Sequence, residues 1–91
     1  MVAVVVRESG EAEHLLESGD HVEANVLPRV KQAAGIVSGL WMTDGAGHTL
    51  NVLVFDSEDA ARAALPRIRN APRPEFLRFE DATVYRVLSH F

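Results

Sequence analysis

The chain has 91 residues, of which 47% are hydrophobic and 24% are charged, a composition typical of one compact domain without room for a second core. Its net charge of −4 argues against a nucleic-acid partner, because affinity for phosphate comes mainly from clustered positive charge. Small domains often need extra burial, and the absence of cysteine excludes disulfides and cysteine-ligated zinc, so we expect association with a second chain.

The first third of the chain predicts a strand followed by a helix. The aliphatic run Val2 to Arg7 is typical of a central strand that stops at Glu8-Ser9-Gly10. Because the run is too short for a signal sequence or a membrane span, we expect a soluble, cytoplasmic protein with no membrane partner. Residues 11–19 could form a helical turn or a polar loop. From Asp20 to Gly35, apolar spacings of four, four and three predict a helix with a kink or restart at Pro28.

Residues 36–43 and 48–55 predict a β-hairpin, since β-branched, aromatic and aliphatic residues flank the turn sequence Asp44-Gly45-Ala46-Gly47. The second strand is apolar on both faces apart from Asn51, which indicates a strand between two layers. A three-residue loop with Gly47 left-handed would place Trp41 opposite Asn51, on one face together with Gly39, whose missing side chain would leave space there. A two- or four-residue loop would separate Trp41 from Asn51.

After the hairpin, Asp56 to Asp59 supplies capping oxygens and first-turn acids for a second helix, which Pro66 interrupts. Residues 70–74 predict an irregular connection, packed down by Phe76, Leu77 and Phe79, and a last strand follows at 82–89. Residues 26–33 and 64–71 share a Leu-Pro-Arg-aliphatic core at matching places, which supports two β-α-β halves.

We therefore predict a single ferredoxin-like α+β domain over residues 1–91, with a βαββαβ order and a four-stranded antiparallel sheet covered by helices on one face. The first and third strands should lie in the middle of this sheet, because they are the most continuously apolar. Their second apolar face needs a partner, so we expect a homodimer.

The pattern resembles the dimeric α+β barrel superfamily, which includes antibiotic-biosynthesis-type monooxygenases and stress-responsive barrel proteins. Three segments carry the resemblance, and it covers nearly the whole chain: the Leu27-Pro28-Arg29 helix leading into residues 35–41, residues 52–61, and the final Val84-Tyr85-Arg86-Val87. The resemblance implies a homodimer and an architecture but specifies no reaction, because the fold hosts oxygenases, isomerases, haem-degrading enzymes and proteins with no known reaction.

The resemblance to cofactor-independent monooxygenases implicates an Asn, a Trp and other polar residues around a hydrophobic cavity. Asn51 and Trp41 match these positions, with Tyr85 and Arg86 as secondary candidates for a ligand pocket. The haem-degrading branch is expected to carry an Asn on the first strand and a His on the second helix, and this sequence has neither. We therefore expect no cofactor, and no catalytic residue can be assigned.

Each candidate also has a purely structural interpretation. A buried amide such as Asn51 could bond to Ser38, Tyr85 or a trapped water, and a single Trp is more often core or interface than pocket wall. The spacing of His14, Glu17 and His21 suggests metal ligands, but Gly19 lies among them, so no metal is predicted.

The charged residues form an acidic N-terminal third and an arginine-rich region at 62–78, which we expect to be solvated rather than to form a docking patch. The sequence therefore favours a homodimer that binds an apolar or aromatic small molecule and resembles cofactor-independent monooxygenases. The alternative is a non-enzymatic structural or regulatory homodimer whose cavity is filled by its own side chains.

Overall fold

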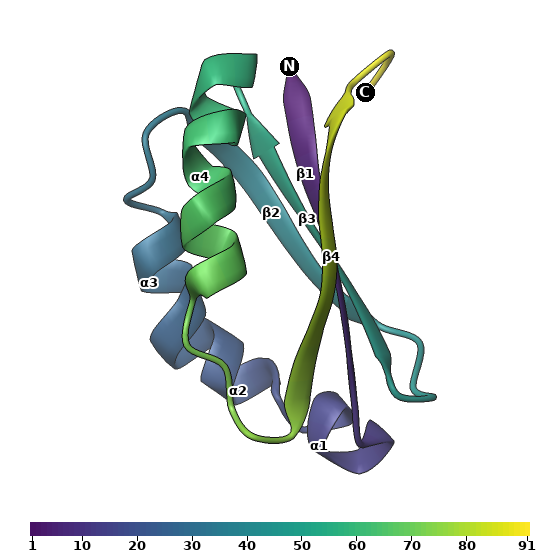
Figure 1. Cartoon of the computed structure of the whole chain (residues 1–91). Coiled ribbons are helices and arrows are strands. Elements are labelled where there is room, and N and C mark those ends of the chain that lie inside the picture. The colour runs from purple at the N-terminus through teal and green to yellow at the C-terminus, as the bar shows by residue number, and fades with distance from the viewer.

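The structure is a computed structural model that describes residues 1–91 and contains one four-stranded antiparallel sheet with the strand order β2-β3-β1-β4. The strands are β1 (Val2–Gly10), β2 (Ile36–Thr43), β3 (His48–Phe55) and β4 (Leu77–Arg86). Helices α2, α3 and α4 cover one side of the sheet, and α1 lies at the end where β1 finishes and β4 begins (Figure 1). The predicted ferredoxin-like architecture, with the first and third strands central, is confirmed.

The connection from β1 to β2 is a succession of short helical segments rather than one helix. Helices α1 (Ala12–Leu16) and α2 (Gly19–His21) precede a π-helical turn, η1 (Val22–Val26), which leads into α3 (Leu27–Val30). Pro28 lies in the first turn of α3, directly after the π-helical turn η1, and the helical backbone continues from η1 into α3 without a break. In place of the kink or restart expected at Pro28, the structure has a change of helix type from π to α directly before it.

Helix α4 (Glu58–Asn70) is continuous and packs against the sheet through Ala61, which is completely buried. The Ser57 side chain caps this helix by accepting a hydrogen bond from the Ala60 N–H at 3.2 Å. The expected interruption at Pro66 is wrong, because the helix runs through it. The fixed φ of proline is helical, and packing of the apolar helix face offsets the single donor that Pro66 removes. None of the helices is both long and apolar enough to cross a membrane.

Three strand boundaries differ from the predictions, and the end of β1 and the start of β4 are linked. Strand β1 continues beyond Arg7 to Gly10, and β4 begins at Leu77 instead of residue 82 and ends at Arg86 instead of residue 89. The extra residues of each strand pair with the other, Glu8 with Phe79 and Gly10 with Leu77, so their backbone groups are satisfied within the sheet. As a result Glu8 belongs to a central strand.

The core lies between the sheet and α4. It consists of the buried side chains that face the helices, namely Val2, Val4, Val6, Leu53, Phe55, Ala61 and Ala82. The opposite face of the sheet carries the partly exposed side chains of Leu40, Met42, Leu50 and Tyr85. Strand β3 is therefore covered by this chain on one face only, and the second layer expected from its sequence is not supplied by the chain itself.

The hairpin has the three-residue loop and the register that its glycines predict. Gly47 has a φ of +99°, the Asp44 N–H donates to the His48 carbonyl at 3.1 Å, and Trp41 pairs with Asn51. The Asp44 carboxylate closes the turn by accepting hydrogen bonds from the N–H groups of Ala46 at 2.7 Å and His48 at 3.1 Å. The turn therefore fixes which side chains of β2 and β3 share a face.

The backbone N–H groups of Ala46 and His48 hold the pKa of Asp44 below its ordinary value of 3.8, because they stabilise the charged carboxylate. A lowered folded-state pKa contributes stability that is present above 3.8 and is lost as the pH falls through the folded-state value. We expect Asp44→Asn to lower the urea midpoint at neutral pH and the difference from the wild type to shrink below pH 3.8. An NMR titration that gives the Asp44 carboxyl a pKa above its ordinary value would contradict this.

Candidate functional site

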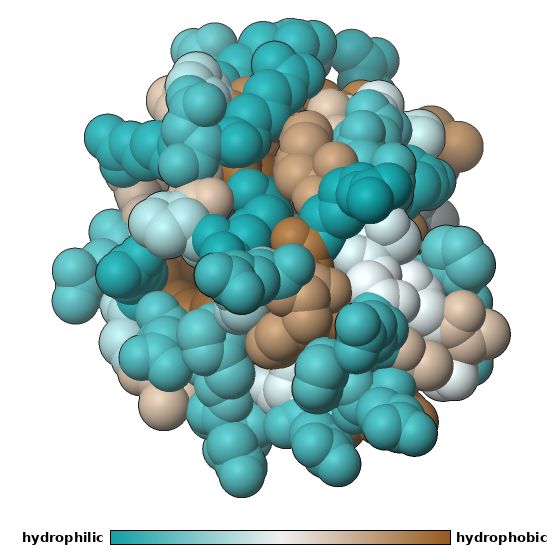
Figure 2. All heavy atoms as spheres, turned by 60° about the horizontal axis from the view of Figure 1, so that its bottom comes forward, coloured by the Kyte–Doolittle hydropathy of each residue, from teal (hydrophilic) through white to brown (hydrophobic).

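A cavity of about 590 Å³ lies between the helix-facing side of the sheet and the helical segments that follow β1. Its walls come from β1, β2 and β3, from residues 15–30, and from the loop 71–76 that leads into β4. Fifteen of its 27 lining residues are hydrophobic, so the interior resembles the mostly apolar pockets that hold small organic molecules. Seen from the end that carries α1, apolar side chains are visible in recesses between polar ones (Figure 2).

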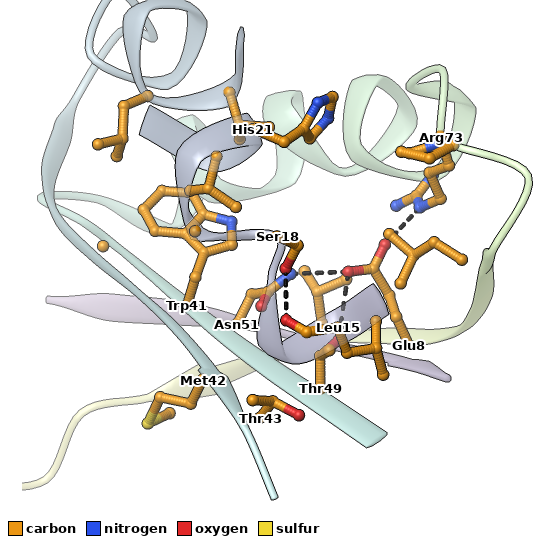
Figure 3. A pocket seen from close by; sticks show the side chains of 18 of the residues that line it. Glu8, Leu15, Ser18, His21, Trp41, Met42, Thr43, Thr49, Asn51 and Arg73 are labelled. Atoms are coloured by element: carbon orange, nitrogen blue, oxygen red, sulfur yellow. Dashed lines mark hydrogen bonds and ion pairs between the residues drawn. The ribbon is translucent and has the colours of Figure 1, made fainter. Parts of the chain in front are cut away.

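Trp41 and Asn51 both line this cavity, and the hairpin register places them side by side. The indole ring lies against Gly39, where an added Cβ would sit 3.0 Å from Trp41 Cζ3 and 3.2 Å from Leu53 Cδ2. The expectation that Gly39 leaves an empty notch is therefore wrong, because the ring of Trp41 occupies that space. The glycine instead lets the aromatic ring lie close to β2 and form part of the cavity wall (Figure 3).

The polar corner of the cavity is built on Glu8, whose side chain is only 7% exposed. Asn51 Nδ2 donates to Glu8 Oε1 at 2.8 Å, and Arg73 Nε donates to Glu8 Oε2 (Figure 3). The hydroxyl of Thr49 lies 3.5 Å from the same Oε1. The side chain that Asn51 bonds to is thus the Glu8 carboxylate, and not Ser38 or Tyr85, which its structural interpretation suggested.

Arg73 ties the loop between α4 and β4 to the sheet. Besides the bond to Glu8, its Nη1 donates to the Ala71 carbonyl at 3.1 Å and its Nη2 to the Ile68 carbonyl at 2.8 Å. The guanidinium also lies over the ring of Phe79, 4.7 Å from its centroid, in cation–π geometry. The prediction that the acidic and arginine-rich regions are solvated is therefore wrong for this pair, which is largely buried.

Glu8 and Arg73 were not among the candidates that the sequence suggested, although the sequence holds a signal for Glu8. Val2, Val4 and Val6 alternate along β1 and face the helices, and Glu8 is the next position in that alternation. Arg73 stands between Pro72 and Pro74 in an irregular loop, where no periodicity indicates the direction of a side chain.

Tyr85 and Arg86 do not line the cavity. Tyr85 pairs with Ala3 and lies on the open face of the sheet, where it is 46% exposed. Arg86 pairs with Val2, at the end of β1 that is remote from Glu8. The structure therefore brings together two of the four residues proposed for a ligand pocket and separates the other two from them.

The spaced residues His14, Glu17 and His21 do not converge on a metal site, since no group of three His, Cys, Asp or Glu side chains is placed to hold an ion. His14 pairs with Glu11 at 3.1 Å and packs on Phe76, while His21 Nδ1 lies 3.2 Å from Asn25 Nδ2. Two hydroxyls of the cavity wall are also engaged, because Ser18 donates to the Leu15 carbonyl and Thr43 to that of His48.

The burial of the Glu8–Arg73 pair predicts strong coupling between the two side chains. Removing one partner leaves the other charge buried and uncompensated, so Glu8→Leu and Arg73→Met should each lower the free energy of unfolding by about 3–5 kcal/mol. The double variant should lose clearly less than the sum of the two, as chemical denaturation of the four proteins would show. Additive losses would mean that the pair contributes no specific interaction.

No protein-family model matches the sequence, and no curated protein is significantly similar to it. Solved structures do share its fold. One is the haem degrader MhuD of Mycobacterium tuberculosis with two haems bound in its active site, with a TM-score of 0.71 and 15% identity over 100% of this chain and 99% of that one.

Two further structures extend the likeness. A monooxygenase of Streptomyces coelicolor in complex with nanaomycin D has a TM-score of 0.66 and 14% identity over 99% of this chain and 89% of that one. A dimeric ferredoxin-like protein from an uncultured marine organism has a TM-score of 0.64 and 16% identity over 99% and 96% of the two chains. The chain therefore shares the ferredoxin-like fold of these proteins, which is the architecture that the sequence resemblance implied.

Proposed function

We propose that this protein is a homodimer that binds a flat, largely apolar organic molecule in the cavity between its sheet and the segments α1 to α3. The observation that carries the proposal is the juxtaposition of Trp41 and Asn51 on one cavity wall. The indole supplies an extended aromatic surface, and the amide beside it supplies one group that can orient a ligand.

The size and composition of the cavity support this function. Its volume of about 590 Å³ falls within the roughly 300–1,000 Å³ of small-molecule sites, and its lining is mostly hydrophobic with few polar groups. The alternative, a structural or regulatory dimer whose interior is filled by its own side chains, is disfavoured by that open volume. Two proteins of the same fold hold organic ligands, one with two haems bound in its active site and the other in complex with nanaomycin D.

Haem itself is a poor match for this chain. The resemblance associates haem degradation with an Asn on the first strand and a His on the second helix, whereas β1 has no Asn and α4 has no His. The proposal therefore favours a metal-free organic ligand of the kind that a cofactor-independent monooxygenase would hold. It assigns binding and leaves any reaction on the bound molecule unassigned.

Ligand binding can be followed through the intrinsic fluorescence of Trp41, the single tryptophan. Titration with a panel of flat aromatic molecules should quench it saturably, and Asn51→Leu should weaken the best ligand about tenfold, the value of one hydrogen bond. Asn70→Leu makes the same change at an exposed position outside the cavity and should leave the affinity unaltered. Absence of saturable quenching across the panel would contradict the proposed function.

The homodimer follows from the face of the sheet that the helices leave open. Leu40 is 60% exposed there and Met42 is 41% exposed, beside Leu50 and Tyr85. An apolar sheet face of this kind is uncommon on a monomer, and a second copy with the same face would bury it symmetrically. Packing of two such sheets would give each β3 the second layer that its sequence predicts.

Leu40→Glu should disrupt this dimer, since a two-fold interface would bury two unpaired carboxylates. We expect the dissociation constant from sedimentation equilibrium to rise by at least about 100-fold. Leu88→Glu is the matched control, because Leu88 is 94% exposed beyond the end of β4. A wild-type protein that is folded and monomeric at micromolar concentration would rule the homodimer out.

A further inference from the structure

We infer that the ion pair between Glu8 and Arg73 fixes the orientation of the Asn51 amide, so that the cavity selects ligands that present a hydrogen-bond donor at its polar corner. The inference rests on the proposed function, because it concerns the ligand held in the same cavity. It makes Glu8 and Arg73 positioning residues, which act on the ligand through Asn51.

The first step concerns the carboxylate. Glu8 is buried and paired with a guanidinium, and an ionised carboxylate can only accept hydrogen bonds. Of the two ends of the Asn51 amide, only the NH₂ group can therefore face Glu8, and Nδ2 does so at 2.8 Å. Reversing the amide would bring its oxygen against the carboxylate and would turn an attraction into a repulsion.

The second step concerns the other end of the amide. Oδ1 and Nδ2 diverge from one carbon, so when Nδ2 faces β1 the oxygen must point away from β1, toward the side of the cavity where Trp41 lies (Figure 3). No residue of the chain donates a hydrogen bond to Oδ1, and no buried side-chain oxygen or nitrogen lacks a partner. Asn51 Oδ1 is thus an acceptor that remains accessible from the cavity.

The third step concerns the neighbouring polar groups, several of whose donors are already bonded within the chain. The three nitrogens of the Arg73 guanidinium already bond to Glu8, Ala71 and Ile68. The hydroxyls of Ser18 and Thr43 donate to backbone carbonyls. A neutral ligand with a hydroxyl or N–H group on a flat apolar body fits the acceptor Asn51 Oδ1, whereas an anionic ligand would be repelled by the neighbouring carboxylate of Glu8.

The test uses three probes with the same naphthalene body, namely 2-naphthol, 2-methoxynaphthalene and 2-naphthoate, and measures each dissociation constant by calorimetry. The wild type should bind 2-naphthol about tenfold more tightly than the methyl ether, and 2-naphthoate most weakly. In Glu8→Gln the new amide can donate or accept a hydrogen bond, so the Asn51 amide can adopt either orientation. The ratio of the dissociation constants of 2-methoxynaphthalene and 2-naphthol should therefore fall toward one.

Glu58→Gln is the matched control, because Glu58 forms an exposed ion pair with Arg62 on α4, away from the cavity, and the preference should persist in it. A role of Glu8 in stability alone would change the affinity for both neutral probes and leave their ratio intact. The ratio therefore distinguishes positioning of the amide from a general structural effect.

A second measurement avoids any variant that could fail to fold. In the wild type, 2-naphthol should shift the Asn51 ¹³Cγ resonance as Oδ1 accepts a hydrogen bond from its hydroxyl, and 2-methoxynaphthalene should not. The inference would be overturned, although the cavity still binds the probes, by any of three results: equal affinity for the two neutral probes, an unchanged preference in Glu8→Gln, or a ¹³Cγ resonance that does not shift. Absence of binding by all three probes would instead count against both the proposed function and the inference.

Discussion

The buried carboxylate of Glu8 is the constraint on which the arrangement of the site depends. A charge with 7% exposure on a central strand costs several kcal/mol unless it is paired and hydrogen-bonded, and its partners come from separate parts of the chain. Arg73 belongs to the loop after α4, and Asn51 belongs to β3. Satisfying one carboxylate therefore fixes the position of that loop, the orientation of an amide and one end of the cavity.

The cavity adjoins the core, and the two share Val6 and Leu53. One part of the helical layer is filled and the other is not, because the two connections between strands are built differently. Helix α4 is continuous and approaches the sheet closely through the small side chain of Ala61. The other connection is divided by the π-helical turn η1 and by Pro28 into segments of three to five residues. Such short segments do not present one long apolar stripe to the sheet, and an unfilled volume remains beneath them.

The features that local chemistry determines could be predicted from the sequence. Gly47 and the capping carboxylate of Asp44 set the hairpin register, and that register correctly places Trp41 beside Asn51. Glu8 was missed because a charged residue normally marks the end of a buried strand. Tyr85 could not be assigned to a face, because no tight turn joins β4 to its neighbour β1 and the sequence therefore does not specify the register between them.

The strict alternation of β3 divides its side chains between two surfaces. Asn51, Leu53 and Phe55 face the helices, and Leu50, Val52 and Val54 face the open side of the sheet. Substitutions on one surface can therefore accumulate during evolution without altering the other, so the cavity wall and the open face of the sheet can diverge separately. An insertion or deletion of one residue within the strand has the opposite effect, since it would exchange the two surfaces beyond that point.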